Sequence, residues 1–498
     1  MLYNKNIISL AIATAVAIPF TVQADRFEHH TATRITHGVA TGDVRSDSAV
    51  IWSRSDAAGT MHVVVKAKGR GRPVYQRTIV SANDDFTGQV QIDGLRPDTE
   101  YEYRVWFGDS KYKRGHRGET AEGQFHTAPA ASTVAPVSFA WGGDLAGQNT
   151  CRDSVEGFPI FNAINNMKLD FFIGLGDMIY ADGLCEATGR YGNSQVPGDF
   201  VQAYDMNNYW AHWKYNREDD GYRSLLASMP YYAIWDDHEV VNDFGPLHDT
   251  RDSAPYTAGD HLLPKGLAAF KDYNPIAENA ETPDRLYRTI RWGKNMEMFI
   301  LDTRQYRDAN LADDSSERPK TMLGREQLNW LKHKLAASDS TWKVIVSSVP
   351  MSIPTGGNGR DGWGNYDQTT GFENELTDIL RFMQQNEMNN VIFITTDVHF
   401  AEAFRYTPFA DAPEFQVHEI VTGPINAGVF PNRAYDDTLN TESLFFFGAD
   451  SASDVTTWEQ AKSWFNYGAI EIDGYGKLNA SIRDINGDIV YNIELDPR

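Results

Sequence analysis

Apolar runs that end abruptly in a carboxylate are the feature that most constrains the fold of this chain. The clearest run, residues 171–175, is followed by Gly176 and Asp177. A short apolar run bounded by glycine is typical of a buried strand. An ionised aspartate is seldom buried without a partner. We therefore expect Asp177 to lie where a buried strand emerges, beside a cation or a donor, with Tyr180 close enough to turn back to the same point.

The same pattern recurs along the second part of the chain. The apolar runs are residues 136–141, 171–175, 231–235, 296–301, 342–349 and 390–396, and five of the six are followed by acids, namely Asp144, Asp177, Asp236 with Asp237, Asp302 and Asp397. Candidate helices lie between them, such as residues 325–337 and 373–387. This alternation predicts layered α/β packing, in which ligands bind at the carboxyl ends of strands. One such aspartate could be a helix cap, but five of them indicate metal ions shared between strand ends.

In the first part of the chain, residues 25–130, the apolar residues recur with a period of two. Residues 48–52, 61–67 and 87–92 read as β-strands separated by Gly, Asp and Ser turns. Residues 95–105 combine a leucine, a proline turn and an alternating Tyr-x-Tyr-x-Val strand, which resembles the tyrosine corner of fibronectin type III domains. We expect a fibronectin-III-like sandwich that acts as a packing or spacer module, with binding of a surface polymer or substrate as the alternative. Small residues at 127–132 mark the boundary to a second domain, residues 131–498.

Length and charge limit the function classes. A chain of 498 residues suits two or three domains. The net charge of −23, from 45 basic and 68 acidic residues, argues against coating nucleic acid or an anionic membrane. An anionic substrate would need local positive charge, which bound metal ions could supply.

The amino terminus has the pattern of a signal peptide. Lys5 precedes an apolar stretch, residues 7–20, that is too short to span a bilayer comfortably. Small residues lead to Ala24, so we expect cleavage after about that residue and a periplasmic or secreted product without a transmembrane anchor. No twin arginine is present. The only cysteines, Cys151 and Cys185, could form a disulfide in such a compartment and are too few for a metal site of their own.

The acids at the strand ends favour a metal centre with oxygen ligands. Asp177 could bridge two cations, and the expected ligands are Asp144, Asp177, Tyr180, Asp237, Asp397 and His399. Hard carboxylate and phenolate oxygens favour Fe(III), Ca²⁺ or Mn²⁺ over a thiolate-type zinc site. Two ions about 3.5–4 Å apart could stabilise both the attacking and the leaving oxygen of an in-line displacement.

Two further residue types complete the expected chemistry. His238 is the natural general acid for the leaving group. Arg304 or Arg307 could hold a phosphate oxygen with a planar guanidinium fork.

Other nearby residues have competing interpretations. Asp302 could be a ligand or could pair with an arginine in the core, and Glu239, Asn242 and Asp243 could be ligands or lie behind them. We expect Asp182 to support a ligand rather than bind metal, and His212 and Trp213 to pack over the site. The Gly-rich residues 356–364 lack the P-loop lysine pattern and suit a mobile rim. Asp260 and His261 are expected at the surface.

Five motifs in order resemble the PhoD-type alkaline phosphatases/phosphodiesterases, relatives of the purple acid phosphatases among the metallophosphoesterases. The motifs are GGD ending at Asp144, GDMIYADG around Asp177, WDDHEVVNDFG from Trp235, LDTRQYR from Leu301 and TTDVHFAE from Thr395. The likeness covers nearly the whole mature chain. It implies a four-layer αββα catalytic domain after the N-terminal sandwich, Fe(III) with Ca²⁺ as cofactors, and Mn²⁺ or Zn²⁺ as other options.

The resemblance also implies residue roles. Asp177 would be the bridging ligand and Tyr180 a ligand of iron. Asp237 occupies the position of the Asn in the GNHE motif of related phosphoesterases, and His238 occupies the position of its His. Asp397 and His399 match the last metal motif.

Two departures from the family pattern bear on the metal. Well-known members place a cysteine at the first metal motif, where this chain has Gly142-Gly143-Asp144. A carboxylate in place of a thiolate would change metal preference. Many members also use a twin-arginine signal, which this chain lacks.

The leading hypothesis is a monomeric, exported phosphomonoesterase/phosphodiesterase that releases phosphate from small or polymeric extracellular esters. The alternatives are a secreted nucleotidase or nuclease, which the acidic charge disfavours because strong nucleic-acid binding is not expected, and a noncatalytic cell-surface binding protein.

Overall fold

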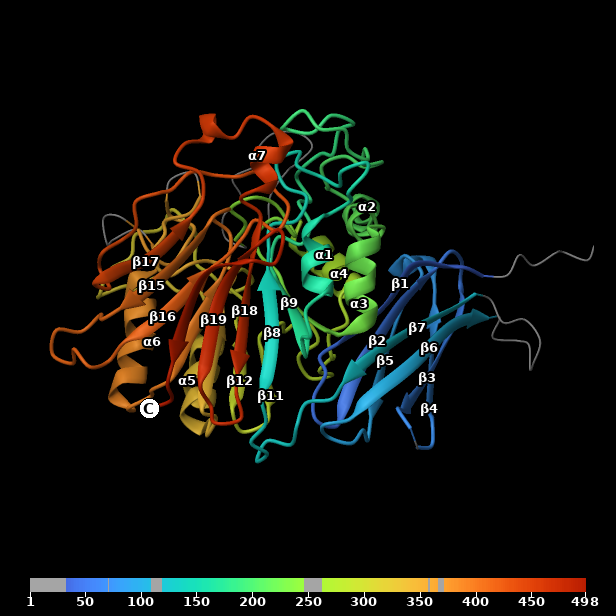
Figure 1. Ribbon diagram of the computed structural model, residues 1–498, viewed down its shortest axis with the longest axis horizontal. Coiled ribbons are helices and arrows are strands. Elements are labelled where there is room, and N and C mark those ends of the chain that lie inside the picture. Colours follow the sequence, from blue (N-terminus) through green and yellow to red (C-terminus); the bar gives the residue numbers. More distant parts are fainter. Residues whose placement is uncertain (1–32, 70, 109–118, 246–261, 357–358, 366–370) are drawn as a thin grey trace, which may run out of the picture.

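A computed structural model describes residues 33–69, 71–108, 119–245, 262–356, 359–365 and 371–498 (Figure 1). The expected signal peptide with its cleavage after Ala24, and the residues Asp260 and His261, lie outside the described residues. Within the described residues, no helix has the length and hydropathy needed to cross a bilayer.

Strands outnumber helices in the described part of the chain. The strands are β1 (Ile35–Gly42), β2 (Ser48–Ser55), β3 (Gly59–Ala67), β4 (Val74–Val80), β5 (Thr87–Asp93), β6 (Glu100–Gly108), β7 (Thr120–His126), β8 (Val137–Gly142), β9 (Phe171–Leu175), β10 (Pro230–Ile234), β11 (Arg288–Trp292), β12 (Met296–Ile300), β13 (Trp342–Val346), β14 (Val391–Thr395), β15 (Ala401–Tyr406), β16 (Val417–Val421), β17 (Thr441–Phe447), β18 (Asn466–Ile472), β19 (Leu478–Asp484) and β20 (Ile489–Leu495). The helices are α1 (Ile160–Asn165), α2 (Met206–Arg217), α3 (Asp220–Ser228), α4 (Leu263–Tyr273), α5 (Gly324–Ala337), α6 (Glu373–Gln385) and α7 (Trp458–Lys462), with short 3-10 turns at Ala82–Asp84 and Ala452–Asp454.

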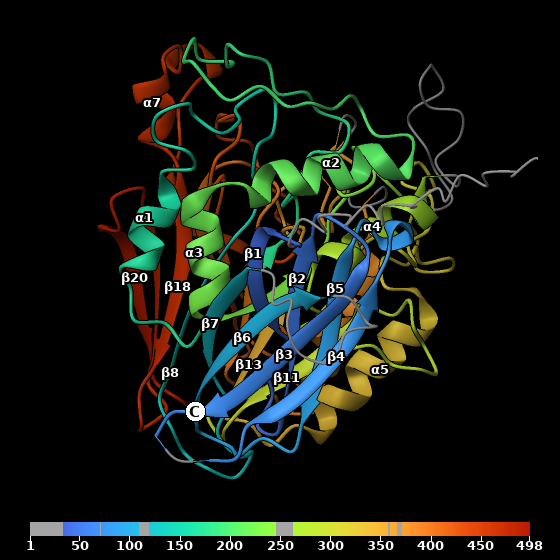
Figure 2. The same cartoon turned by 90° about the vertical axis from the view of Figure 1, so that its right-hand side faces the viewer.

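An all-β region, β1 to β7, precedes a mixed α/β region, and the two lie side by side (Figures 1 and 2). The strands predicted at residues 48–52, 61–67, 87–92 and 95–105 are confirmed as β2, β3, β5 and β6. Strands β4, β3, β6 and β7 form a separate four-stranded sheet. Alternate residues of β3 and β6 are buried, as their period of two predicts.

Three of the N-terminal strands belong to a sheet that continues into the α/β region. The nine-stranded sheet has the order β20-β19-β18-β8-β9-β10-β1-β2-β5. The junction is a short parallel pairing of β1 with β10, in which Thr41 lies opposite Pro230 and Gly42 opposite Tyr231. A buried ion pair between Asp43 and Arg288 (2.8 Å) adds to this junction. The linker at residues 127–132 therefore separates the two regions along the chain but not in the sheet.

The six apolar runs of the α/β region are confirmed as strands of two sheets. Strands β8, β9 and β10 run parallel in the nine-stranded sheet, and β12, β13, β14 and β16 run parallel in a seven-stranded sheet of order β11-β12-β13-β14-β16-β15-β17. Parallel neighbours end at the same edge, so the residues that follow these strands gather there. Helices α5 and α6 lie where residues 325–337 and 373–387 predict them.

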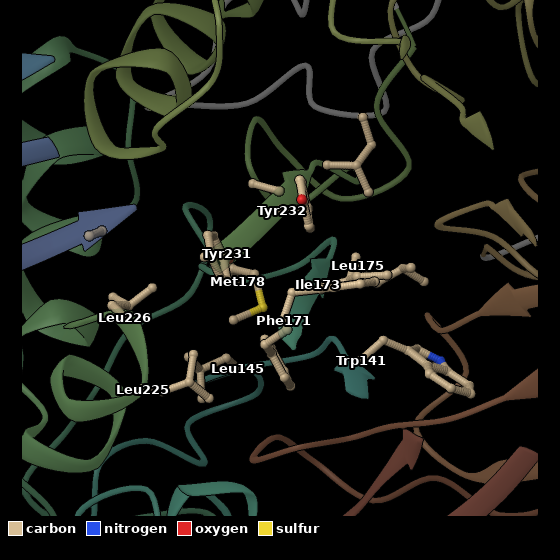
Figure 3. Close-up of a cluster of buried hydrophobic side chains, with 14 of the residues drawn as sticks. Trp141, Leu145, Phe171, Ile173, Leu175, Met178, Leu225, Leu226, Tyr231 and Tyr232 are labelled. Atoms are coloured by element: carbon tan, nitrogen blue, oxygen red, sulfur yellow. The ribbon is translucent and has the colours of Figure 1, made fainter. Parts of the chain in front are cut away.

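The two faces of β13 serve different cores. Val344 and Val346 belong to a large apolar cluster that also contains Phe171 and Ile173 of β9. Ile345, on the opposite face, belongs to a second cluster that contains Leu331 of α5 and other side chains of α5 and α6. Figure 3 shows part of the first cluster, with Phe171, Ile173 and Leu175 beside Tyr231, Tyr232, Leu225 and Leu226. Strands buried on both faces in this way read as continuous apolar runs.

The Cys151–Cys185 disulfide links the loop that follows β8 to the loop that follows β9, so the bond that the sequence allowed is present. The bond joins residues 34 positions apart and brackets β9, Asp177 and Tyr180. Both cysteines of the chain are used in it, so no thiolate is left to bind metal.

Candidate active site

The acids that end the apolar runs meet at the carboxyl edge of the two sheets. Asp144 follows β8, Asp177 follows β9, Asp236 and Asp237 follow β10, and Asp397 with His399 follows β14. Four of these residues have left-handed backbone conformations, with φ of 63° at Asp144, 52° at Asp177, 81° at Asp397 and 63° at His399. Non-glycine residues seldom adopt positive φ, and they gather at functional sites. Strands β8, β9 and β14 are thus followed by sharp turns that bring these side chains to the shared edge.

Asp144, Tyr180 and His399 form one side of the site. The Tyr180 hydroxyl lies 2.9 Å from Nε2 of His399 and 3.5 Å from Oδ1 of Asp144. Oδ1 of Asp144 lies 3.6 Å from Nε2 of His399. Gly423 makes the arrangement possible, because a Cβ on it would lie 2.2 Å from Oδ2 of Asp144. His399 donates from Nδ1 to the Gly428 carbonyl, so Nε2 is the nitrogen whose lone pair faces the Tyr180 hydroxyl and the site.

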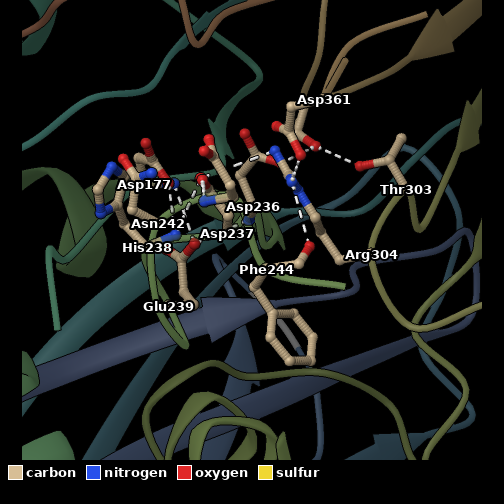
Figure 4. Close-up of polar contacts among 12 residues, drawn as sticks. Asp177, Asp236, Asp237, His238, Glu239, Asn242, Phe244, Thr303, Arg304 and Asp361 are labelled. Atoms are coloured by element: carbon tan, nitrogen blue, oxygen red, sulfur yellow. Dashed lines mark hydrogen bonds and ion pairs between the residues drawn. The ribbon is translucent and has the colours of Figure 1, made fainter. Parts of the chain in front are cut away.

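The remaining acids crowd together on the other side. Single oxygens from Asp177, Asp236, Asp237 and Asp397 all lie within 4.8 Å of one another. A second such group combines Asp177, Asp237 and His238, and a third combines Asp237, Asp243 and Asp361. Figure 4 shows most of these side chains pointing toward a common centre. The structure therefore brings together all six residues expected to hold metal.

The acids lie in a buried cluster in which several carboxylate oxygens have no hydrogen-bond partner. Asp144 is fully buried, and Asp177, Asp236 and Asp237 expose 3% or less of their surface. The Oδ2 atoms of four aspartates are buried without a hydrogen-bond partner, and these are Asp144, Asp177, Asp236 and Asp397. Burial, together with neighbouring carboxylates, raises the pKa of Asp144, Asp177 and Asp397 well above the usual range. A cluster of this kind needs cations to stay ionised, so the donor set fits metal ions.

His238 lies beside the acids and is held by Asp182. Its Nδ1 is 2.6 Å from Oδ1 of Asp182, and its ring centre is 4.1 Å from that of Tyr180. Burial lowers the pKa of His238, but Asp182 and Asp237 outweigh burial and raise this pKa to about 10. Asp182 thus orients the imidazole, and Nε2 is the nitrogen that remains for a reacting group. This placement agrees with the expectation that Asp182 supports another residue rather than binding metal.

Arg304 is completely buried behind the acids. Its Nε donates to Asp236 (2.5 Å) and its Nη1 to Asp361 (2.8 Å), while Nη2 lies 3.7 Å from Asp237 without a hydrogen-bond partner. Arg307 is also buried and donates to Asp361 (2.6 Å). Arg304 and Arg307 hold the pKa of the Asp361 carboxyl at about 2, against the effect of burial. Both guanidinium groups are thus engaged in fixing acids of the site.

Two acids that the sequence left open now have defined contacts. Glu239 accepts hydrogen bonds from the amides of Asp177 (3.0 Å), Met178 (2.8 Å) and Asp236 (2.7 Å), so it ties together the turns after β9 and β10. Asp302 accepts hydrogen bonds from the Trp235 indole (3.0 Å) and from backbone amides, including that of Arg304 (3.0 Å). Within the described residues, no arginine side chain forms an ion pair with it. Glu239 and Asp302 therefore act as internal anchors.

Two residues of the site were not singled out from the sequence. Asp236 was read only as part of a run with Asp237, and Asp361 only as part of the Gly-rich segment. The doubled acid after β10 was the available signal for Asp236. No local pattern marks Asp361, because its role depends on Arg304 and Arg307 from a distant segment.

His212 and Trp213, the residues expected to pack over the site, lie in α2. This helix contacts the site loops through Tyr209, which donates to the Val240 carbonyl (2.9 Å), and through Asn216, which donates to the Met178 carbonyl (2.7 Å). His212 instead lies 3.1 Å from the Val201 carbonyl, and its ring packs on Phe200. Part of the Gly-rich residues 356–364 lies outside the described residues, so their mobility stays a prediction.

Comparisons with known proteins agree with this geometry. The family model described as PhoD-like phosphatase matches residues 139–484, and the model of its N-terminal domain matches residues 21–129. Alkaline phosphatase D of Bacillus subtilis (strain 168) is 27% identical over 397 residues, which cover 73% of this chain and 64% of that protein. Tartrate-resistant acid phosphatase type 5 of Mus musculus is 24% identical over 234 residues, or 45% of this chain and 58% of that protein. The chain thus spans less than two thirds of the curated relatives it matches.

A solved structure described as that of PhoD superposes with a TM-score of 0.69, at 21% identity, over 93% of this chain and 92% of that one. At this identity the match concerns the fold, an all-β N-terminal region followed by a mixed α/β region.

Proposed function

The chain belongs to the PhoD-like phosphatase family, and from that membership together with its acidic centre we infer that it is a metal-dependent hydrolase of phosphate esters. We propose that it acts on both monoesters and diesters and releases phosphate from organic esters outside the cytoplasm.

One observation carries the proposal. Four carboxylate oxygens, the Oδ2 atoms of Asp144, Asp177, Asp236 and Asp397, are buried at the same sheet edge without any partner. Uncompensated buried carboxylates cost several kcal/mol each, by order of magnitude. An exported binding protein without catalytic metals would have no reason to keep them.

We propose that the ions are Fe(III) and Ca²⁺, with Mn²⁺ or Zn²⁺ as substitutes. Asp177 is the proposed bridging ligand; it lies in two of the three groups of possible ligands, and Asp237 lies in all three. Asp144, Tyr180 and His399 would hold one ion, and Asp237 with Asp397 would complete the site. Bound there, the ions would supply Lewis-acid stabilisation of the charge that develops on a transferring phosphoryl group.

His238 is the proposed general acid. Asp182 on Nδ1 fixes the ring and keeps it protonated, so Nε2 presents a proton toward the acidic cluster. A proton from Nε2 would neutralise the leaving oxygen as the ester bond breaks.

Arg304 is proposed to serve the phosphate through Nη2, which has no hydrogen-bond partner, and to position Asp236 and Asp361 through Nε and Nη1. Its complete burial makes positioning the larger part of this role.

We also propose a finer description of the fold. The amide of Arg96 donates to the Tyr101 hydroxyl (2.8 Å), which supports the tyrosine corner of a fibronectin-III-like sandwich spanning about residues 25–130. Two observations support a four-layer αββα arrangement in residues 131–498. Apolar clusters lie on opposite faces of β13, and Phe161 in α1 packs on Tyr222 in α3 (4.9 Å between ring centres).

We propose that the protein is exported after cleavage near Ala24 and works as a monomer in the periplasm or medium. The disulfide supports an oxidising compartment. The net charge of −23 disfavours long nucleic acid as the substrate.

The test combines metal analysis with two chromogenic substrates. Protein as purified should contain metal and should hydrolyse 4-nitrophenyl phosphate and bis(4-nitrophenyl) phosphate. A chelator should abolish both activities, and added Fe(III) with Ca²⁺ should restore them. Asp177→Asn should lose metal and activity together, whereas the exposed control Asp450→Asn should keep both. Turnover that survives complete metal removal, or an absence of turnover with every metal tried, would overturn the proposal.

A further inference from the structure

Two arginines flank the side of the site formed by Asp144, Tyr180 and His399, and none of the roles above uses them. Arg433 is half-buried and Arg190 is exposed. They come from separate loops, one after β9 and one after β16.

Arg433 reaches the site through Phe430. The Phe430 ring stacks on the imidazole of His399 with 4.4 Å between ring centres. The guanidinium carbon of Arg433 lies 5.8 Å from the centre of the same Phe430 ring. An arginine that stacks on an aromatic face keeps its N–H groups directed outward in the ring plane, available to an anion.

Arg190, in the loop after β9, is held against the loop after β8. Its backbone amide donates to the Asn149 carbonyl (2.7 Å), and the hydroxyl of the neighbouring Tyr191 accepts from the Val429 amide (2.8 Å). The loop lies directly against Tyr180, because a Cβ on Gly147 would be 2.4 Å from its ring. The guanidinium carbon of Arg190 lies 5.8 Å from the Tyr191 ring centre. The loop that carries Val429, Phe430 and Arg433 therefore contacts the segment that carries Arg190.

The charges of Arg190 and Arg433 are not neutralised locally. Neither guanidinium lies within ion-pair distance of a carboxylate in the described parts of the chain, although acids outnumber bases by 68 to 45. Unpaired arginines beside a proposed phosphate site suit a further anion.

We propose that Arg190 and Arg433 form an anion subsite, the arginine rim, that binds a second negatively charged group of the substrate. This inference rests on the proposed function, because the reacting phosphate must sit at the acidic centre. It assigns a substrate class: phosphate esters whose retained group carries another phosphate or similar anion, as in polyphosphorylated molecules or chains of phosphodiesters.

The experiment uses two diesters with the same leaving group. Propyl 4-nitrophenyl phosphate has a neutral retained arm, and its 3-phosphonopropyl analogue has an anionic arm that cannot itself be hydrolysed. We expect the metal-loaded wild-type enzyme to have a kcat/KM for the anionic-arm diester at least about tenfold above that for the neutral-arm diester, a preference that added salt reduces. Arg190→Gln/Arg433→Gln should remove most of this preference, mainly through KM. Arg77→Gln, the same change on an exposed residue of β4, should keep it.

The outcomes separate this inference from the proposed function. If the wild type hydrolyses neither diester nor the monoester, the proposed function fails. If it hydrolyses both diesters with equal kcat/KM, or if the double variant keeps the wild-type ratio, the arginine rim is wrong while the proposed function stands. A fold defect is excluded when the double variant and Arg77→Gln have the same unfolding midpoint and metal content.

Discussion

Replacing Glu239 by glutamine should loosen the metal-binding turns without removing a metal ligand. The Glu239 side chain is fully buried, and its two carboxylate oxygens accept hydrogen bonds from three backbone amides. Two of these amides, those of Asp177 and Asp236, share Oε2, and the third, that of Met178, bonds to Oε1. A glutamine of the same shape has only one oxygen. This oxygen can accept from the amides of Asp177 and Asp236, but the NH₂ group of the glutamine then faces the Met178 amide. Both of these groups are donors, so no hydrogen bond forms between them.

The size of the effect follows from these contacts. A buried amide left without an acceptor costs about 2 kcal/mol, so the unfolding free energy should fall by about that amount. Burial raises the pKa of Glu239 to about 8, although the three amides oppose the rise. Because a raised pKa means that the folded state favours the neutral carboxyl, the comparison belongs at pH 6, where Glu239 is protonated and both side chains are neutral.

The assay is urea denaturation of metal-loaded protein at pH 6, followed by tryptophan fluorescence, with elemental analysis of the same samples. Glu102→Gln, an exposed glutamate of β6, serves as the matched control and should change the unfolding free energy by less than about 0.5 kcal/mol. If Glu239→Gln unfolds within that margin of the wild type and retains all its metal, Glu239 does not hold the two turns together and the reasoning fails.

Two further predictions concern the rest of the fold. Removing the disulfide with Cys151→Ser/Cys185→Ser should lower the unfolding free energy by about 4 kcal/mol, because the bond closes a loop of 34 residues in the unfolded chain; equal urea midpoints for the variant and the oxidised wild type would contradict this. Asp272, which accepts from the Trp210 indole (2.7 Å), has a pKa raised to about 7 by burial. Since this pKa lies above the value in the unfolded chain, the stabilising effect of the bound proton is present at low pH and is lost as pH rises toward 7. Asp272→Asn should therefore lose less stability between pH 5 and pH 8 than the wild type, and identical slopes of unfolding free energy against pH would show that Asp272 is not the responsible group.

Much of the active-site edge was predictable because it is encoded in contiguous residues. An apolar run followed by glycine and aspartate specifies a buried strand and a sharp turn, whatever the rest of the chain does. The runs that end at Asp144 and Asp177 are of this kind, and the structure places both side chains at one edge. The order of the five motifs along the chain indicated the family, whereas each motif taken alone does not.

Other parts could not be predicted because they depend on contacts between distant segments. The pairing of β1 with β10 joins residues that are nearly 190 positions apart (Gly42 with Tyr231), so no local pattern announces that the N-terminal strands extend the catalytic sheet. The C-terminal strands β18 to β20 were missed for a related reason, since β18 finds its place by pairing with β8. The contacts of Arg304 with Asp236 and Asp361 likewise join three segments.

The sequence by itself determined where carboxylates must stand, because burying the strands leaves each acid only the strand end. Only the tertiary structure decided which of their oxygens would have donors. Glu239 and Asp302 received backbone amides and became anchors, whereas Asp144, Asp177, Asp236 and Asp397 kept oxygens without partners. Backbone amides come from whichever turn packs nearby, and that packing is a property of the whole fold rather than of any single segment.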